Sequence, residues 1–110
     1  MTYLHCKKLL FLVVSLVATT SFAGASALPT YSITINNGQF SPANLNVKSQ
    51  QRFKIKIKNI GTTPAEFENL SLRVEKVLGS QVASFVIVPP LPAGTYDFIE
   101  EFHPSSPPFQ

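Results

Sequence analysis

The sequence predicts an all-β sandwich, and two observations support this fold class. Apolar and polar residues alternate with a period of two over several short segments, which is the pattern of half-buried strands. Turn-forming pairs such as Asn37-Gly38 and Gly79-Ser80 separate these segments at short intervals, and no stretch has the period of a long helix. Short strands at roughly even spacing are typical of a β-sandwich or a small barrel.

Each expected strand has its own pattern. In residues 30–36, the apolar Ile33 and Ile35 alternate with polar neighbours. In residues 52–59, basic residues alternate with phenylalanine and isoleucine, whereas residues 81–88 are apolar on both faces, which indicates a buried strand. The complete set of expected strands is 30–36, 44–48, 52–59, 65–69, 72–77, 81–88 and 94–100.

The N-terminal region has the features of an export signal. Lys7 and Lys8 precede an apolar run, residues 9–18, that is too short for a membrane-spanning helix. The sequence Ala-Ser-Ala that ends at Ala27 predicts cleavage after this residue, with Ala23 and Ala25 as alternative sites. A retained N-terminal anchor is the competing interpretation.

Cleavage at this site divides the chain into three parts. We expect a signal peptide at residues 1–27, a domain at 28–104 and a Pro-rich, irregular tail at 105–110. The mature protein would have no transmembrane span, and we expect it to be periplasmic or secreted.

Removal of the signal also removes the soft metal ligands. The chain has one cysteine, Cys6, and one methionine, Met1, and of its two histidines only His103 lies beyond the signal. The mature chain can therefore form no disulfide, no thiolate nucleophile and no cysteine-based zinc or blue-copper site.

Length and charge exclude further classes of function. Removing 27 residues from a chain of 110 leaves 83, which is one small domain. Lys7 and Lys8 supply two of the nine basic residues, so seven basic residues face six acidic ones and the mature net charge is +1, which gives no basis for nucleic-acid binding. Because the chain has no nucleophile elbow and no insertion that could build a substrate cleft, we predict no enzymatic activity.

A basic stripe lies on one expected strand. Arg52, Lys54, Lys56 and Lys58 place four positive charges on the same strand face. This is either a docking stripe for an acidic partner or membrane surface, or a solvated outer face that discourages edge pairing. No aromatic residues are interleaved as in binders of single-stranded nucleic acid, so we favour the solvated face.

Two acidic groups complete the set of candidate functional residues. Glu66 and Glu68 share a face because side chains repeat every two residues in a strand, and Glu75 follows on the next one. Glu100, Glu101 and His103 form the second group. Without further evidence, such carboxylates are ordinary surface charges and such a histidine is satisfied by a hydrogen bond.

Seven segments, taken in order, resemble one known family. They are YSITI (31–35), QFSP (39–42), residues 52–59 with Gly61, EFE (66–68), LRVEK (72–76), LPAGTY (91–96) and EFH (101–103). This order resembles the cupredoxin-like domain family of the EfeO type, small exported proteins or modules linked to bacterial iron and copper handling. The resemblance covers residues 30–104 and implies a cupredoxin-like, Greek-key β-sandwich.

The resemblance also implies a metal site. Compared with copper-carrying cupredoxins, Glu66 occupies the position of the first histidine ligand, Glu100 that of the cysteine and His103 that of the second histidine. Glu68, Glu75 and Glu101 are candidates for a second metal site or for supporting the first. Carboxylates and one imidazole are hard ligands, suited to Cu(II) or iron rather than to a thiolate electron-transfer centre. The implied function is capture or delivery of copper or iron, with a membrane iron-uptake component or another periplasmic protein as partner.

The end of the chain departs from the family pattern. Family members continue past this point with a glycine and a final apolar strand, whereas this chain ends in PSSPPFQ. We therefore expect the last strand to be truncated, so that a partner could supply it by edge addition. This leaves an alternative function, a β-sandwich that binds no metal and serves as a protein-interaction module.

Overall fold

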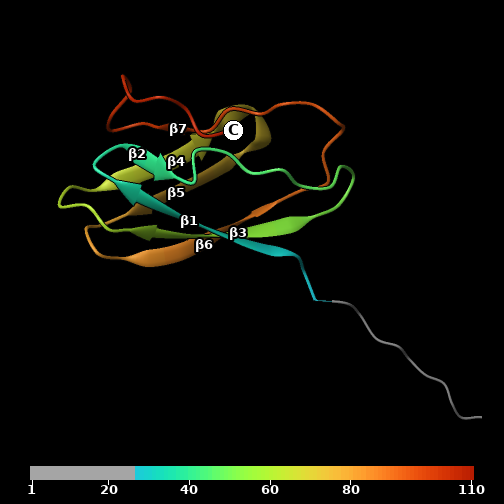
Figure 1. Ribbon diagram of the computed structural model, residues 1–110, viewed down its shortest axis with the longest axis horizontal. Helices are drawn as coiled ribbons and strands as arrows, with labels where there is room; N and C mark the ends of the chain where they lie inside the picture. The colour runs from blue at the N-terminus through green and yellow to red at the C-terminus, as the bar shows by residue number, and fades with distance from the viewer. Residues whose placement is uncertain (1–26) are drawn as a thin grey trace, which may run out of the picture.

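The computed structural model describes residues 27–110, which form two sheets. The strands are β1 (Thr30–Asn36), β2 (Gln39–Ser41), β3 (Phe53–Asn59), β4 (Ala65–Asn69), β5 (Val74–Leu78), β6 (Ala83–Val88) and β7 (Ile99–Glu100), with the short 3₁₀ helix η2 (Leu70–Leu72) between β4 and β5. The first sheet has the order β2-β1-β3-β6, and the second sheet has the order β5-β4-β7. Figure 1 shows β3 and β6 side by side in one layer and β4 and β5 in the other. The all-β sandwich is confirmed.

The predicted signal peptide, residues 1–27, lies outside the described residues except for Ala27. In the part of the chain that the structure describes, no helix has the length and apolar character needed to cross a membrane.

The first sheet combines one parallel pair with antiparallel pairs. β1 runs parallel to β3, with Ile33 opposite Ile57, and β3 runs antiparallel to β6, with Ile55 opposite Val86. The lysines of β3 alternate with these core residues and therefore point to the outer face, as the sequence predicts. Lys56 and Lys58 are exposed, which fits a solvated outer face.

The core lies between the sheets and is rich in phenylalanine. The Phe67 and Phe98 rings stack with centroids 4.8 Å apart and planes 7° apart, and the Phe109 ring packs on both at 5.8 and 6.2 Å. Offset or tilted rings at such distances add favourable quadrupole contacts to the burial of apolar area. Phe67 thus anchors the middle of β4, the strand that carries two of the candidate glutamates.

Two expected strands differ from the structure. Residues 44–48 form no strand, and only Ile99–Glu100 of the expected strand 94–100 pairs in a sheet. In the first case the backbone of Leu45 bonds to the C-terminal residue, since its N–H donates to the Gln110 C=O at 2.7 Å. In the second case, residues 94–97 form an irregular segment between the proline-rich residues 89–92 and β7. β7 is short because only two of its residues pair with β4.

The C-terminal tail also differs from its expected place outside the domain. Phe109 is 2% exposed, and its backbone N–H and C=O exchange hydrogen bonds of 2.8 Å with those of Phe98. The segment is irregular, as expected from its prolines, yet Phe109 forms an isolated antiparallel bridge with Phe98. Residues 105–110 therefore belong physically to the domain.

Candidate metal centre

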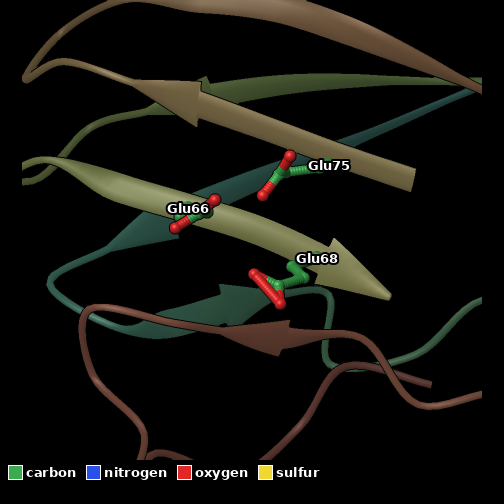
Figure 2. A group of neighbouring side chains, drawn as sticks. All are labelled: Glu66, Glu68 and Glu75. Carbon is green, nitrogen blue, oxygen red and sulfur yellow. The ribbon is translucent and has the colours of Figure 1, made fainter. Parts of the chain in front are cut away.

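Three carboxyl groups converge on the outer face of the second sheet. Glu66 and Glu68 flank Phe67 on β4, and because Phe67 faces the core, both glutamates face outward. Glu75 lies directly opposite Glu68 on β5. One carboxylate oxygen from each of the three residues lies within 4.8 Å of the others, and Figure 2 shows the three groups together across the two strands. Within residues 27–110, this is the one group of three or more such ligands that is so close.

Proximity and burial hold part of this cluster in the protonated form. The pKa of Glu66 is raised from 4.5 to about 7, first because Glu75 shares a hydrogen bond with it, then through loss of solvation and repulsion by Glu75, Glu68 and Glu101. The pKa of Glu68 is also raised, first by burial and then by the charges of Glu101 and Glu75. Carboxylates this close cannot all ionise without cost, so the raised pKa lets Glu66 keep its proton to a higher pH than a free glutamate does.

Glu68 is buried without a partner. Only 5% of this residue is exposed, yet no hydrogen bond or ion pair within residues 27–110 engages its carboxyl group. Its carboxyl oxygens reach solvent, because no side-chain oxygen in the described residues is both fully buried and without a hydrogen-bond partner. Buried polar groups are normally hydrogen-bonded, and a buried carboxylate is normally paired or bound to a metal. Because the Glu68 oxygens reach solvent, water can hydrate them, and a cation that approaches from the same side could bind them.

Glu100 and His103 form a separate, satisfied pair. Glu100 lies opposite Phe67 in the β4–β7 ladder, so its side chain faces the interior, and the residue is 2% exposed. Its Oε1 lies 2.5 Å from Nδ1 of His103, and its Oε2 accepts from the N–H of Phe102 at 2.7 Å and from the N–H of Glu66 at 3.4 Å. A carboxylate only accepts, so Nδ1 carries the proton of the imidazole.

The loops around His103 are themselves tightly positioned. Nε2 of His103 lies 3.5 Å from Oγ1 of Thr63, which also donates to Oδ1 of Asn37 at 3.1 Å. Gly38 has φ +91°, and a Cβ there would lie 2.6 Å from Cβ of His103. A glycine is required because a side chain would occupy the space of the imidazole and strain the backbone. The Glu100–His103 pair thus joins the turn after β7 to the first sheet.

The buried Asn59 fixes the loop that leads into β4. Its Nδ2 donates to the C=O groups of Thr63, Leu78 and Gly79 at 2.8 to 3.2 Å, and its Oδ1 accepts from the N–H of Gly61 at 3.0 Å. Two of these bonds join the end of β3 to the loop before β4, and the other two join it to the end of β5. The strands that carry Glu66 and Glu75 therefore share one rigid support.

The structure divides the predicted site in two. Glu66 lies with Glu68 and Glu75 on the outer face of the sheet. Glu100 lies with His103 on the inner side, because Glu100 pairs with Phe67 and not with Glu66. Neighbouring residues of a strand point to opposite faces, so Phe67 and its partner face away from Glu66. Glu101 lies on the outer side, where its N–H donates to the C=O of Glu66 at 3.0 Å. Coordination of one metal by Glu66, Glu100 and His103 stays a prediction. The geometry instead favours a site formed by Glu66, Glu68 and Glu75. From the sequence alone, Glu68 and Glu75 are candidates only for a second or supporting site.

The residues present suit some metals and not others. Residues 27–110 contain no cysteine and no methionine, so the residues present do not fit a thiolate copper centre. Three carboxylates are hard oxygen ligands, which suit iron, manganese or Cu(II). A bound cation would replace the proton that Glu66 keeps and supply a partner for Glu68.

Comparison with known families gives one match that spans most of the chain. A family model described as cupredoxin-like domain matches residues 8–108. No curated protein matches the chain.

Proposed function

The chain belongs to the cupredoxin-like domain family, and from this premise we propose that it is an exported protein that captures a hard metal cation, iron or Cu(II), and delivers it to a partner. The observation that carries the proposal is the convergence of three carboxyl groups within 4.8 Å of one another, among them Glu68, whose oxygens reach solvent and have no hydrogen-bond partner within residues 27–110. The apparent export signal and the resemblance to the EfeO type support a membrane iron-uptake component as that partner.

The ligands come from rigid elements. Glu66 and Glu68 are two residues apart on one strand, and Glu75 is opposite Glu68 on the next, so backbone hydrogen bonds fix the spacing of all three. Pre-positioned ligands lower the cost of ordering the site when a cation binds. Glu66 and Glu75 are less buried than Glu68, so the cation keeps access to water on one side, as exchange with a partner requires.

Calorimetric titration of the protein with Cu(II), Fe(II), Mn(II) and Zn(II) tests the proposal. We expect saturable binding at one site for at least one of these ions, and loss of that binding in Glu68→Gln, which keeps the shape of the side chain but removes its charge. Glu101→Gln is the matched control, because Glu101 is a neighbouring acid outside the cluster of three. Binding that survives in Glu68→Gln, or no binding by folded wild-type protein, would contradict the proposal.

A parallel titration of Glu100→Gln separates the two halves of the predicted site. If the cation binds at Glu66, Glu68 and Glu75, this variant should bind with wild-type stoichiometry. If the cation binds at Glu100 and His103 instead, Glu100→Gln should lose binding and Glu68→Gln should keep it. The two variants therefore give opposite results for the two locations.

A further inference from the structure

The outer face of the first sheet carries a row of positive charges. Lys54, Lys56 and Lys58 alternate on β3 with buried core residues, so their side chains share the outer face, and Arg52 continues the row just before the strand. Three of the four residues are exposed and Lys54 is partly exposed. No ion pair within residues 27–110 engages any of them. This basic row therefore presents its full charge to the surroundings.

Charge is divided unequally between the two layers of the sandwich. Residues 27–61, which include β1, β2 and β3, contain five basic residues and no acidic one. Residues 62–110, which include the second sheet, contain two basic residues and all six acidic ones. β6, the remaining strand of the first sheet, is uncharged. The small net charge of the domain thus conceals a basic layer and an acidic layer, which Figure 1 shows on opposite sides.

Two features of the structure favour docking over a merely solvated face. β3 lies between β1 and β6, so its lysines protect no sheet edge from pairing. The aromatic side chain that β3 lacks comes from β6, where Phe85 lies opposite Lys56. Phe85 is 47% exposed, and Nζ of Lys54 lies 4.6 Å from the centroid of its ring. An exposed ring therefore lies among the ammonium groups.

The chemistry of this face is complementary to an anionic lipid surface. Lipid phosphates attract clusters of lysine and arginine, and an aromatic ring beside them can enter the headgroup layer. β1 and β6, which flank the row, carry no acidic residue that would repel the phosphates. The groove between Phe85 and residues 73–76 has two basic residues and one acidic residue, so its charge is also positive.

We propose that the outer face of the first sheet docks the protein on an anionic phospholipid surface. The basic row contacts the lipid phosphates, and the ring of Phe85 enters the headgroup layer. In this orientation the second sheet, with its cluster of Glu66, Glu68 and Glu75, faces away from the lipid. The docking needs no metal and is tested in EDTA, so its outcome is independent of the proposed metal binding.

Co-sedimentation with vesicles tests the docking. Residues 28–110 are used, because they contain both sheets and the whole core, whereas the apolar run at 9–18 can bind lipid by itself. We expect binding to vesicles of equal parts phosphatidylglycerol and phosphatidylcholine, and none to phosphatidylcholine alone. Binding should be lost between about 0.1 M and about 1 M salt, since the Debye length falls from about 10 Å to about 3 Å.

Three results of this experiment would overturn the proposal. They are no binding to the anionic vesicles, equal binding to both kinds of vesicle, and binding that is indifferent to salt. Retention on polyglutamate without binding to the anionic vesicles would also overturn it, because the face would then serve an acidic protein.

Two substitutions separate this face from net charge. Lys56→Gln removes one charge from the middle of the row and should weaken vesicle binding about fivefold. Glu101→Gln removes an acidic charge from the other sheet, which lies about 10 Å away, about one Debye length at 0.1 M salt. We expect this control to bind like wild type, and the double variant, whose net charge equals that of wild type, to bind as weakly as Lys56→Gln. Wild-type binding by the double variant would show that net charge and not this face determines binding, and would refute the docking.

A third substitution tests the aromatic contact. Phe85→Ala should weaken vesicle binding several-fold at constant salt, because the ring no longer enters the headgroup layer. Phe102→Ala is the matched control: Phe102 is 49% exposed but lies in the turn after β7, so this variant should bind like wild type. Equal losses in the two variants, or wild-type affinity in Phe85→Ala, would contradict the proposed contact of this face with the lipid.

Discussion

The two faces of the second sheet hold glutamates in different environments. On the inner side, Glu100 of the neighbouring strand accepts hydrogen bonds from His103, Phe102 and Glu66, so its carboxylate is satisfied by the protein itself. On the outer side, Glu68 has no partner among the described residues, and its neighbours, Glu75 first, raise the pKa of Glu66 to about 7. The hydrogen-bonded Glu100 stabilises the fold. The carboxyl groups of the outer cluster repel one another, and binding of a proton or a cation reduces this repulsion.

The largest effect that tests this contrast is expected for Glu100→Ala. The variant leaves the His103 imidazole and the N–H of Phe102 without their acceptor in a partly buried place, and unpaired donors cost about 1–3 kcal/mol of unfolding free energy. Urea denaturation should therefore show a clear loss of stability. Glu101→Ala is the control, because Glu101 is exposed and surface substitutions usually change stability by no more than about 0.5 kcal/mol. If the two substitutions change the free energy of unfolding equally, the structural role assigned to Glu100 is wrong.

A loss of comparable size is expected for Gly38→Ala. The added Cβ would lie 2.6 Å from Cβ of His103, and Gly38 has a positive φ that non-glycine residues adopt at a cost of about 1–3 kcal/mol. The imidazole must then shift, which lengthens its bond to Glu100. A thermal melt compares this variant with Gly79→Ala, where the nearest atom to an added Cβ is a Val82 methyl group at 3.6 Å, an ordinary contact. A Gly38→Ala midpoint as high as that of Gly79→Ala would show that the pair does not depend on this close approach.

The sequence predicts the outer cluster of glutamates better than it predicts the position of Glu100. Side chains alternate strictly within a strand, so the shared face of Glu66 and Glu68 follows from their spacing alone. The face of Glu100 relative to Glu66 depends on the register between β4 and β7, which is set by core packing around Phe67 and by the length of the preceding turn. A shift of one residue in that register would have placed Glu100 with Glu66.

The C-terminus illustrates a second limit of prediction. The two prolines before Phe109 and the lack of alternation exclude a strand, and the structure agrees that none forms there. Burial of Phe109, however, depends on the space left beside Phe98 by the short second sheet, which no local pattern reveals. The match of the chain to the cupredoxin-like family indicates the overall fold but not this contact of Phe109 with Phe98.

The pH dependence of stability tests the outer cluster. The pKa of Glu66 is about 7 in the folded protein and near 4.5 when the group is free, so between these values the folded state binds more protons than the unfolded state. The contribution of Glu66 to the stability of the metal-free protein should therefore be greatest below about pH 4.5. This contribution should be lost as the pH rises through about 7. Thermal midpoints at pH 5 and pH 8 in EDTA measure the difference, and Glu66→Gln should reduce it. An unchanged pH dependence in Glu66→Gln would show that the proton is not held there.

Cation binding should show the opposite trend. A metal ion competes with the proton that Glu66 keeps, so affinity should rise between pH 5 and pH 8 and binding near pH 7 should release protons. Titration in two buffers with different ionisation enthalpies counts these protons. Proton release near zero at pH 7, together with equal affinities at pH 5 and pH 8, would show that the bound ion does not use Glu66.

The smallest effect is expected for Glu68→Gln without metal, and its sign is informative. Burial and the charges of Glu101 and Glu75 raise the pKa of Glu68, so the ionised form is disfavoured in the folded protein. Removing the charge should slightly stabilise the metal-free protein at pH 8, where Glu100→Gln should destabilise it because His103 and the N–H of Phe102 lose the carboxyl group that they contact. Chemical denaturation of both variants in EDTA compares the signs. If Glu68→Gln is destabilising as well, the Glu68 carboxylate has a partner in solution, and the case for a cation at this cluster loses its main support.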